Sequence, residues 1–287
     1  MRGMRCSVII PARNEGKNLK MTVDSFLGAQ EAAELIVLDD GSQDGCAEFL
    51  AAGYGEVRLL RTGGIGPAHA RNRGAELARG DVLVFADAHV RVPKGWLRAV
   101  LRALEDPAVA GLCPAIAALG DEDRVGYGQT WDSRLKVRWL PRPKERLTPV
   151  PLLPGGFLVV RRETFEAVGG FNRGFRGWGH EDEELSLRLW LFGHNLFCLR
   201  TLTVRHLFRR RHPYRVTSLE TDHNLLRMAV SHFSVERLAR TVRLLPQTGN
   251  RLLSEVILGS ALRDRERWFY SRVRTDDWFM ERFSIPF

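Results

Sequence analysis

The feature that most limits the fold of this chain is a regular alternation of short apolar runs with amphipathic stretches over its first 113 residues. The apolar runs have the character of buried strands and read CSVIIPA, ELIVLDDGS, VRLLRT, GDVLVFADAHV and VAGLCPAI. Helical patterns lie between them, such as the stripe formed by Leu19, Val23, Phe26 and Leu27. This alternation predicts an α/β fold whose mostly parallel sheet carries helices on both faces. Uniformly apolar strands agree with that prediction, because such strands are buried on both sides.

The fourth apolar run ends in Asp87-Ala88-His89, which places a carboxylate and an imidazole two residues apart. Residues i and i+2 of a strand point to the same side, so both side chains are directed at one point, which suits a metal ion. The alternative is a strand that simply reaches water at its C-terminal end. Open α/β sheets bind ligands at the C-terminal ends of their strands, so we expect the functional site at this edge.

Three further polar clusters also follow predicted strands. They are residues 11–15 (PARNE), residues 39–44 (DDGSQD) and His206 at the end of the last strand. Each has a purely structural alternative: Asp39 and Asp40 would cap a turn and the following helix, and His206 would be a surface histidine.

The periodicity changes in the second half of the chain. Residues 120–150 are basic, aromatic and proline-containing, so we expect a long loop or a short antiparallel excursion over the site. The pattern then predicts a strand and helix start at GGFLVVRRETF, an acid-led helix at GHEDEELSLRLWLFG and a last strand at LFCLRTLTVRHLF. From Thr217 onward the pattern is helical, and Thr217 with Glu220 has the spacing of a capping box.

Composition narrows the classes of protein that fit. No apolar run approaches the roughly 18 residues needed to cross a bilayer, and Pro11 and Arg13 interrupt the N-terminus too early for a signal peptide. The four cysteines show no CxxC pairing, which argues against a thiolate zinc site or a disulfide scaffold and favours a reducing cytosol. The net charge of +9 attracts polyanions, anionic lipids and phosphorylated small molecules alike.

Taken in order, these motifs resemble the family 2 glycosyltransferases of the GT-A fold, a Rossmann-like fold of nucleotide-diphospho-sugar transferases. The matching blocks are SVIIPARNEGKNL, LIVLDDGSQDG, ARNRGAELARGDVLVFADAHV and GGFLVVRRETFEAVGGFNRGFRGWGHEDEELSLRLWLFG. The resemblance covers about residues 5–208, and the later block is especially similar to polypeptide N-acetylgalactosaminyltransferases and the C-terminal region of β-1,4-galactosyltransferases. It implies a catalytic domain at 1–208, with a nucleotide-binding half at 1–115 and an acceptor-binding half at 116–208. A helical extension would follow at 209–287.

The resemblance implies a divalent metal site. Most relatives hold the ion on a nucleotide diphosphate with Asp-x-Asp, and the Asp-x-His variant of the polypeptide transferases matches Asp87 and His89. A later histidine of those relatives matches His206 in RHLFR, which completes the expected ligand set. One carboxylate with two imidazoles suits Mn²⁺ better than Mg²⁺, although Mg²⁺ is compatible. The ion would neutralise the leaving diphosphate.

The same resemblance assigns residues to the nucleotide of the donor. In relatives, the end of the first strand and the second acid of the Asp-Asp pair bind uridine, and the matching residues are Pro11, Arg13, Glu15 and Asp40. A carboxylate can accept a hydrogen bond from uracil N3–H, which cytosine lacks, so a UDP sugar is the expected donor. Arg71 matches a basic position near uracil and diphosphate, with a solvated helix residue as the alternative.

Four other residues complete the expected donor site. Gly155 and Gly156 match positions where relatives bring backbone close to the donor sugar, with an ordinary turn as the alternative. Asp87 would act on the diphosphate through the metal, and Trp178 would offer its apolar face to a sugar ring.

Four consecutive acids, Glu181 to Glu184, begin a predicted helix, where the helix dipole alone favours acidic residues. In inverting relatives the Asp of a Glu-Asp pair at this place deprotonates the acceptor hydroxyl, and Asp182 matches it. The resemblance therefore implies inversion, with Asp182 as general base and Glu181 binding acceptor or donor hydroxyls. The retaining polypeptide transferases have Asn there, so the metal motif favours retention while Asp182 favours inversion. We give more weight to the residue that touches the reacting atoms.

Residues 209–287 lie beyond the resemblance. Arg237, Arg240 and Arg243 recur on one helix face, and the simplest interpretation is a solvated face on a helix that packs against the catalytic domain. The alternative is a surface for anionic lipid or a lipid-phosphate acceptor, with aromatic side chains as interfacial anchors. These aromatic residues, which suit a core or a dimer contact equally well, are Trp268, Phe269, Tyr270, Trp278 and Phe279.

The sequence thus predicts a metal-dependent glycosyltransferase of the hexosyltransferase type that acts on a glycan, lipid-linked or small-molecule hydroxyl acceptor. We expect it in the cytoplasm, where peripheral contact with the inner face of the membrane and homo-oligomers are both compatible with the sequence. The alternatives are a retaining transferase of the same fold and a non-catalytic nucleotide-sugar binder. A nucleotidyltransferase is less favoured because residues 11–16 lack a Gly-x-Gly-x-Arg loop, and a nucleic-acid binder is least favoured because no such motif is present.

Overall fold

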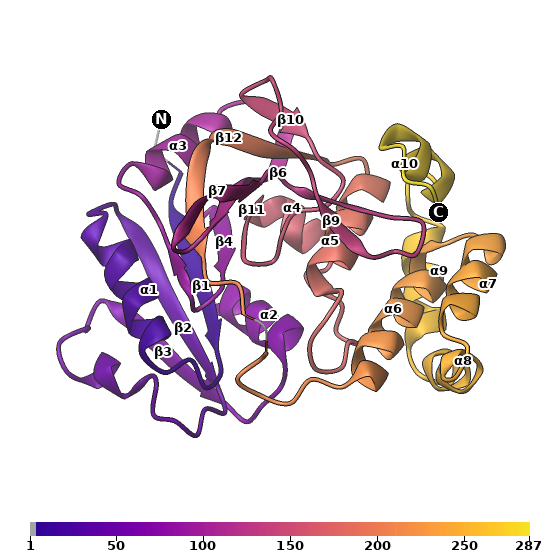
Figure 1. Cartoon of the computed structure of the whole chain (residues 1–287), viewed down its shortest axis with the longest axis horizontal. Helices are drawn as coiled ribbons and strands as arrows, with labels where there is room; N and C mark the ends of the chain where they lie inside the picture. The colour runs from indigo at the N-terminus through magenta and orange to yellow at the C-terminus, as the bar shows by residue number, and fades with distance from the viewer. Residues whose placement is uncertain (1–3, 210) are drawn as a thin grey trace.

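The structure is a computed structural model that describes residues 4–209 and 211–287. Strands and helices alternate through the first half of the chain, as the apolar pattern predicts (Figure 1). The strands of this half are β1 (Cys6–Ala12), β2 (Ala33–Asp40), β3 (Val57–Thr62), β4 (Val82–Ala86), β5 (Val90–Arg91) and β6 (Val109–Ala118). Its helices are α1 (Lys17–Gly28), the 3-10 turn η1 (Glu48–Ala51), α2 (Pro67–Leu77) and α3 (Trp96–Ala103).

One sheet connects the two halves of the chain, with the strand order β10-β12-β6-β11-β4-β1-β2-β3. The later strands in it are β10 (Leu147–Pro149), β11 (Phe157–Arg161) and β12 (Asn195–His206). β1, β2, β3 and β4 pair in parallel, and so do β6 and β12. β11 lies antiparallel between β4 and β6 and interrupts the parallel pairing. Because β11 is antiparallel to both neighbours, β4 and β6 still point the same way, and their C-terminal ends share one edge with those of β1, β2 and β12.

The segment between β6 and β11 is an antiparallel excursion, which was one of the two structures expected for it. β7 (Asp121–Gly126) pairs antiparallel with β6, and β8 (Gln129–Trp131) pairs antiparallel with β9 (Val137–Trp139). β6 runs through the proposed boundary at residues 115 and 116, so the two halves share a strand, and their division into nucleotide and acceptor halves stays a prediction.

The sheet is buried on both faces, which explains its uniformly apolar strands. In β1, Val8 and Ile10 contact the core under α1 and α3, whereas Ile9 contacts the core on the opposite face. That opposite core contains residues of α2, α4 (Arg162–Ala167) and α5 (Glu181–Leu191). Helices therefore cover both faces of the sheet, as predicted.

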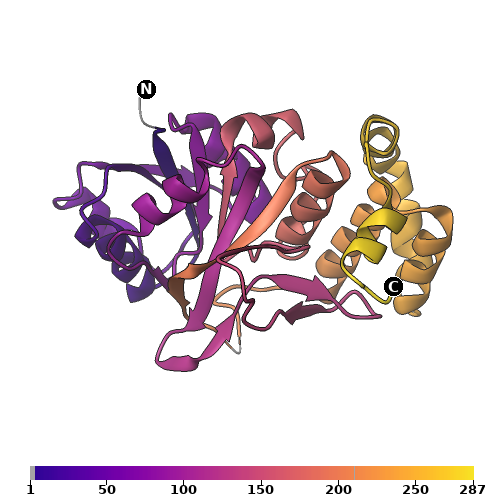
Figure 2. The same cartoon turned by 90° about the horizontal axis from the view of Figure 1, so that it is seen from above.

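The C-terminal residues form five helices in the described part of the chain, and these gather at one end of the molecule beside α5 (Figure 2). They are α6 (Ser218–His232), α7 (Val235–Leu244), α8 (Gly249–Leu258), α9 (Ala261–Phe269) and α10 (Asp276–Arg282). The predicted capping box at the start of α6 is present, because Thr217 Oγ1 accepts from Glu220 N and Glu220 Oε2 accepts from Thr217 N. Within the described ranges, no helix combines the length and the apolarity that a bilayer crossing requires.

Three aromatic residues of this extension pack against α5 and β8. Trp268 lies under the guanidinium of Arg188 and Trp278 contacts Trp190, both in α5, and Phe279 contacts Trp131 of β8. Trp268 and Phe279 are buried, and Phe269 and Trp278 are half-buried, which leaves only Tyr270 exposed. Burial supports the interpretation as core residues for Trp268 and Phe279, and a membrane or dimer contact through the other three stays a prediction.

The basic face of α7 is solvated at Arg240 and Arg243, as expected, but not at Arg237. The Arg237 guanidinium lies 3.0 Å from a carboxylate oxygen of Asp276 and also pairs with Asp277. It is nearly buried, so it ties α7 to α10 instead of facing solvent. Arg240 and Arg243 are both exposed, and the Arg240 guanidinium lies over the ring of Phe287.

Candidate active site

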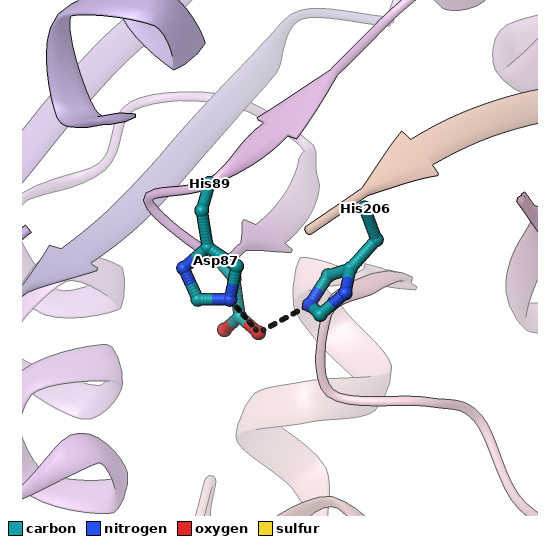
Figure 3. A group of neighbouring side chains, drawn as sticks. All are labelled: Asp87, His89 and His206. Atoms are coloured by element: carbon teal, nitrogen blue, oxygen red, sulfur yellow. Dashed lines mark hydrogen bonds and ion pairs between the residues drawn. The ribbon is translucent and has the colours of Figure 1, made fainter. Parts of the chain in front are cut away.

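Asp87, His89 and His206 converge at the C-terminal edge of the sheet (Figure 3). Each offers one potential ligand atom, and these atoms all lie within 4.8 Å of one another. Nε2 of His206 lies 3.2 Å from Oδ2 of Asp87, and Nε2 of His89 lies 3.7 Å from the same oxygen. Within the described residues, this is the group of three ligand-type side chains whose spacing would suit a metal ion.

Backbone pairing between distant segments brings the two histidines together. β5 pairs antiparallel with the end of β12, with Val90 opposite His206. The amide of Leu207 then donates to the carbonyl of His89 at 3.0 Å, so His206 at the end of β12 lies beside His89, which immediately precedes β5. Asp87 is fixed separately, because its amide donates to the carbonyl of Gly156 at 3.0 Å. The alternative of a surface histidine is wrong for His206, whose side chain is only 13% exposed.

The electrostatics of the cluster keep Asp87 in the form that binds cations. Burial would raise the pKa of Asp87, but the hydrogen bond with His206 and the electrostatic interactions with His89 and Arg71 outweigh it. The net effect holds the pKa of Asp87 well below its ordinary value. The carboxylate is therefore ionised across the physiological range.

Arg71 connects this cluster to the start of α5. Its side chain is buried and donates to Glu181 at 2.8 Å, to Asp87 at 3.1 Å and to the carbonyl of Gly155 at 3.2 Å. The alternative of a solvated helix residue is therefore wrong. A buried guanidinium shared by two carboxylates fixes both of them in place, because Arg presents several donors in a rigid plane.

A cavity of about 420 Å³ lies on one side of the cluster. Five of the predicted donor-binding residues line it together with Arg71 and Asp87, namely Pro11, Arg13, Glu15, Asp40 and Trp178. The cavity is also lined by residues that sequence reasoning did not single out, from the connection between β12 and α6: Arg209, His212 and Tyr214. The basic character of RHLFRRRHPYR was the only signal that could have found them.

The two acids at the end of β2 have local partners. Asp39 accepts a hydrogen bond from the amide of Ser42 at 3.0 Å, which is the turn-capping role considered as its alternative. Asp40 accepts from the Thr62 hydroxyl and from the amides of Ile65 and Gly66, at 2.7, 2.7 and 2.8 Å. Asp40 therefore holds the loop after β3 while its side chain also lines the cavity.

A second cavity, of about 330 Å³, lies on the other side of the cluster. It is lined by Asp182, Gly155 and Gly156, and by Val137 and Trp139 of the antiparallel excursion. Both cavities share a group of lining residues, which includes Asp87 and His206. The cluster therefore lies at the junction of the two cavities.

Gly155 and Gly156 are needed because other groups approach their backbone closely. A Cβ on Gly155 would lie 2.9 Å from Oδ2 of Asp182, and one on Gly156 would lie 2.8 Å from the ring of His206. Neither distance is compatible with a side chain unless the neighbour moves. Both glycines lie in a turn against which Asp182 and His206 pack, and their predicted approach to a donor sugar stays a prediction.

Asp182 differs from the other acids at the start of α5. Glu181 pairs with Arg71, Glu183 with His180, and Glu184 with Arg188 and His232. Asp182 has no ion pair within the described part of the chain, and Oδ2 accepts a hydrogen bond from the amide of Gly155 at 2.6 Å. It is also the one partly exposed member of the four. Structural pairing thus accounts for three acids and leaves Asp182 facing the second cavity.

The surroundings of Asp182 raise the pKa of its carboxyl to about 7. Burial is the largest cause, and the negative charges of Glu181 and Glu183 add to it, while Arg71 and the Gly155 amide oppose it. A carboxylate with a pKa near neutrality can exchange protons with a hydroxyl group far better than an ordinary one. His180 precedes these acids in the left-handed conformation, with φ of 65°, and lines the same cavity.

Comparisons with known proteins agree with this geometry. Residues 7–169 match the family described as glycosyl transferase family 2, and residues 142–213 match the N-terminal domain of galactosyltransferase. Polypeptide N-acetylgalactosaminyltransferase 8 of Drosophila melanogaster is 34% identical over 226 residues, which are 71% of this chain and 38% of the relative. Polypeptide N-acetylgalactosaminyltransferase 13 of Homo sapiens is 30% identical over 238 residues, 72% of this chain and 42% of the relative. The chain thus spans less than half the length of these curated relatives.

Solved structures show the same fold. GalNAc-T7, crystallised with UDP, GalNAc and Mn²⁺, superposes with a TM-score of 0.78 at 23% identity, covering 99% of this chain and 57% of that one. TarS of S. aureus, in complex with UDP-GlcNAc, superposes with a TM-score of 0.61 at 17% identity, covering 93% and 79%. The predicted GT-A fold is confirmed.

Proposed function

This chain belongs to glycosyl transferase family 2, and on that basis we propose that it transfers a sugar from a nucleotide diphosphate sugar to a hydroxyl acceptor. The observation that carries the proposal is the position of Asp87, His89 and His206 at the junction of two cavities. The donor nucleotide would occupy the larger cavity and its diphosphate would lie at the cluster. Its sugar would then face the second cavity, where Asp182 lies.

A UDP sugar is the donor that we propose first. Arg13 and Arg209 line the larger cavity and supply positive charge for phosphate groups, and Tyr214 supplies an aromatic ring. The two oxygens of Asp40 accept three hydrogen bonds, and a carboxylate has about four acceptor positions, so one stays available for uracil N3–H. UDP in GalNAc-T7 and UDP-GlcNAc in TarS support this choice by likeness of fold.

The Asp87 cluster fits a divalent cation, and we propose Mn²⁺ ahead of Mg²⁺. Asp87 is held in its ionised form, and both histidines direct Nε2 toward it. One hard oxygen and two imidazole nitrogens make a borderline ligand set. When bound, the ion would neutralise the negative charge that develops on the leaving diphosphate.

Asp182 is the general base in this proposal. The Gly155 amide binds Oδ2 and orients the carboxylate, which leaves Oδ1 for the acceptor hydroxyl. Asp182 takes the proton of that hydroxyl as its oxygen attacks the anomeric carbon from the side opposite the diphosphate, so the configuration inverts. Arg71 keeps Glu181 in place beside Asp182, where Glu181 can bind sugar hydroxyls.

We also propose that the protein is cytoplasmic and that its C-terminal extension makes peripheral contact with a membrane.

The test of this function is a panel of UDP and GDP sugars incubated with the full chain in Mn²⁺, in Mg²⁺ and in EDTA. We expect UDP to be released from a UDP sugar in Mn²⁺, even without an acceptor, because water hydrolyses the donor slowly. We expect no release in EDTA. Release in EDTA would rule out the metal. The absence of release from every donor, together with measurable UDP binding, would support the non-catalytic binder instead.

The pH dependence of turnover tests the base. The active form of Asp182 is the ionised one, and its fraction falls as the pH drops below a pKa of about 7. We expect kcat/KM to fall about tenfold for each pH unit below that value and to level off above it. A profile that is flat between pH 5.5 and 7.5 would contradict the assignment.

A further inference from the structure

Glu15 has two buried contacts that a nucleotide-binding role does not require. Its carboxylate is 6% exposed, and Oε1 lies 3.3 Å from Nδ1 of His89. The guanidinium of Arg209 binds both oxygens of the same carboxylate, with the bond to Oε1 at 3.2 Å. Both oxygens are therefore engaged by the protein itself.

The contact between Glu15 and His89 affects the tautomer of the His89 ring. Nδ1 of His89 faces Glu15, and Nε2 faces Asp87 and His206 (Figure 3). A carboxylate beside Nδ1 favours the tautomer with its proton on that nitrogen, which leaves the lone pair on Nε2 directed at the cluster. Carboxylates in this position behind a metal-binding histidine commonly fix both its tautomer and its orientation. Nδ1 of neither histidine makes a hydrogen bond of good geometry in the described residues, but only Nδ1 of His89 has a carboxylate oxygen recorded beside it, that of Glu15 at 3.3 Å.

The contact between Glu15 and Arg209 affects the position of His206 through the backbone. Arg209 follows His206 by three residues, in the connection between β12 and α6. Glu15 lies between β1 and α1, so its pairing with Arg209 holds the connection against the end of β1. One carboxylate is thus linked to both imidazoles, to His89 through a side-chain contact and to His206 through the chain.

We propose that Glu15 is a positioning residue for the metal site, which holds His89 in the metal-binding tautomer and clamps the connection that follows His206. This inference rests on the divalent cation of the proposed function. It assigns Glu15 a different role from the uridine contact expected from the sequence.

The test is Mn²⁺ binding to the full chain, measured by titration calorimetry without nucleotide, for the wild type, Glu15→Gln and Glu15→Ala. Second-sphere partners of metal ligands typically contribute about 10–100-fold to affinity. We expect Glu15→Ala to weaken Mn²⁺ binding within that range and Glu15→Gln to weaken it less, because the amide oxygen can still accept from Nδ1–H. The matched control is Glu34→Gln, a carboxylate paired with Arg58 at 2.8 Å and outside both cavities, which should not change Mn²⁺ affinity.

A spectroscopic measurement separates positioning from a general loss of structure. In the metal-free protein labelled with ¹⁵N-histidine, the His89 signals of the wild type should be those of the Nδ1–H tautomer, and Glu15→Ala should shift them toward a mixture. Unchanged Mn²⁺ affinity with weakened UDP binding in Glu15→Ala would overturn the inference and restore the uridine role. A wild-type chain that does not bind Mn²⁺ would overturn the metal of the proposed function, and this inference with it.

Discussion

Replacing Asp182 by Asn is expected to lower kcat for sugar transfer by about 10³-fold, within the range of 10²–10⁴ that a general base contributes. Asn has nearly the same shape and can still accept the hydrogen bond of the Gly155 amide, which binds Oδ2 at 2.6 Å in the wild type. It cannot take the proton of the acceptor hydroxyl. The measurement is initial-rate kinetics with saturating donor, together with the dissociation constant of UDP, which should not change.

The stability of this variant distinguishes a lost base from a damaged fold. A carboxyl whose pKa is raised in the folded state, here from 3.8 to about 7, destabilises the fold increasingly as the pH rises between those values. Asn carries no such penalty. Asp182→Asn should therefore unfold at a higher temperature than the wild type at pH 8, and this difference should shrink toward pH 4. A variant that is less stable at pH 8 would indicate that Asp182 serves the fold instead of the reaction.

The configuration of the product gives the stereochemical part of the same prediction. With Asp182 as base on the side opposite the diphosphate, an α-linked donor should yield a β-linked product, observable by ¹H NMR of the anomeric proton. A product with the configuration of the donor would contradict the role of Asp182 and support the retaining alternative. The kinetics of Asp182→Asn therefore test the base, and the anomeric configuration of the product tests the stereochemistry independently.

Replacing His206 by Ala is expected to abolish Mn²⁺-dependent turnover at metal concentrations that saturate the wild type. It removes one of three ligand atoms, and we expect Mn²⁺ affinity to fall by on the order of 100-fold or more, at least as much as for loss of a second-sphere partner. The fold should survive, because the His206 side chain lies at a strand end and contacts chiefly Asp87, His89 and Phe208. Calorimetric Mn²⁺ titration and a thermal melt measure the two effects.

The matched control is His194→Ala, because His194 lies just before the opposite end of β12 and lines neither cavity. It should keep the wild-type response to Mn²⁺. Undiminished turnover of His206→Ala in Mn²⁺ would remove His206 from the ligand set. Equal losses in both variants would show that disturbing β12, and not removing a ligand, causes the effect.

Local sequence was sufficient for much of the fold. The most uniformly apolar runs correspond to β1, β2, β4 and β6, because strands buried on both faces need apolar side chains at nearly every position. The edge strand β3 is only half-buried and contains Arg58 and Arg61. The pattern could not place β11 between β4 and β6, since an antiparallel strand buried on both faces has the same composition as a parallel one. For the same reason the aromatic residues of the extension were ambiguous, and packing assigns Trp268 and Phe279 to the interior.

The acids at the start of α5 also show which part of the candidate site local sequence predicts and which part depends on packing. Four consecutive acids look equivalent in the sequence, and the helix dipole favours all of them. Their roles separate only through partners from elsewhere in the chain: Arg71 reaches Glu181, and His232 reaches Glu184. Among the residues that the structure describes, Asp182 has no ion pair, and it faces a cavity, so its raised pKa depends on the fold and not on its neighbours in sequence alone.

By itself, the sequence determined where the uniformly apolar strands run, because burial on both faces requires apolar side chains within each strand. Alternation along a strand does not explain why Asp87 and His89 converge, because β4 ends at Ala86 and both residues lie in the turn before β5. Only the tertiary structure decided that His206, 119 residues beyond Asp87, lies 3.2 Å from its carboxylate. That closeness arises from the pairing of β5 with β12. Tertiary packing also decides that Arg71 pairs with Glu181 and that the carboxylate of Glu15 lies behind His89. Contacts between residues far apart in the chain depend on how whole strands and helices pack, and a local pattern contains no information about that packing.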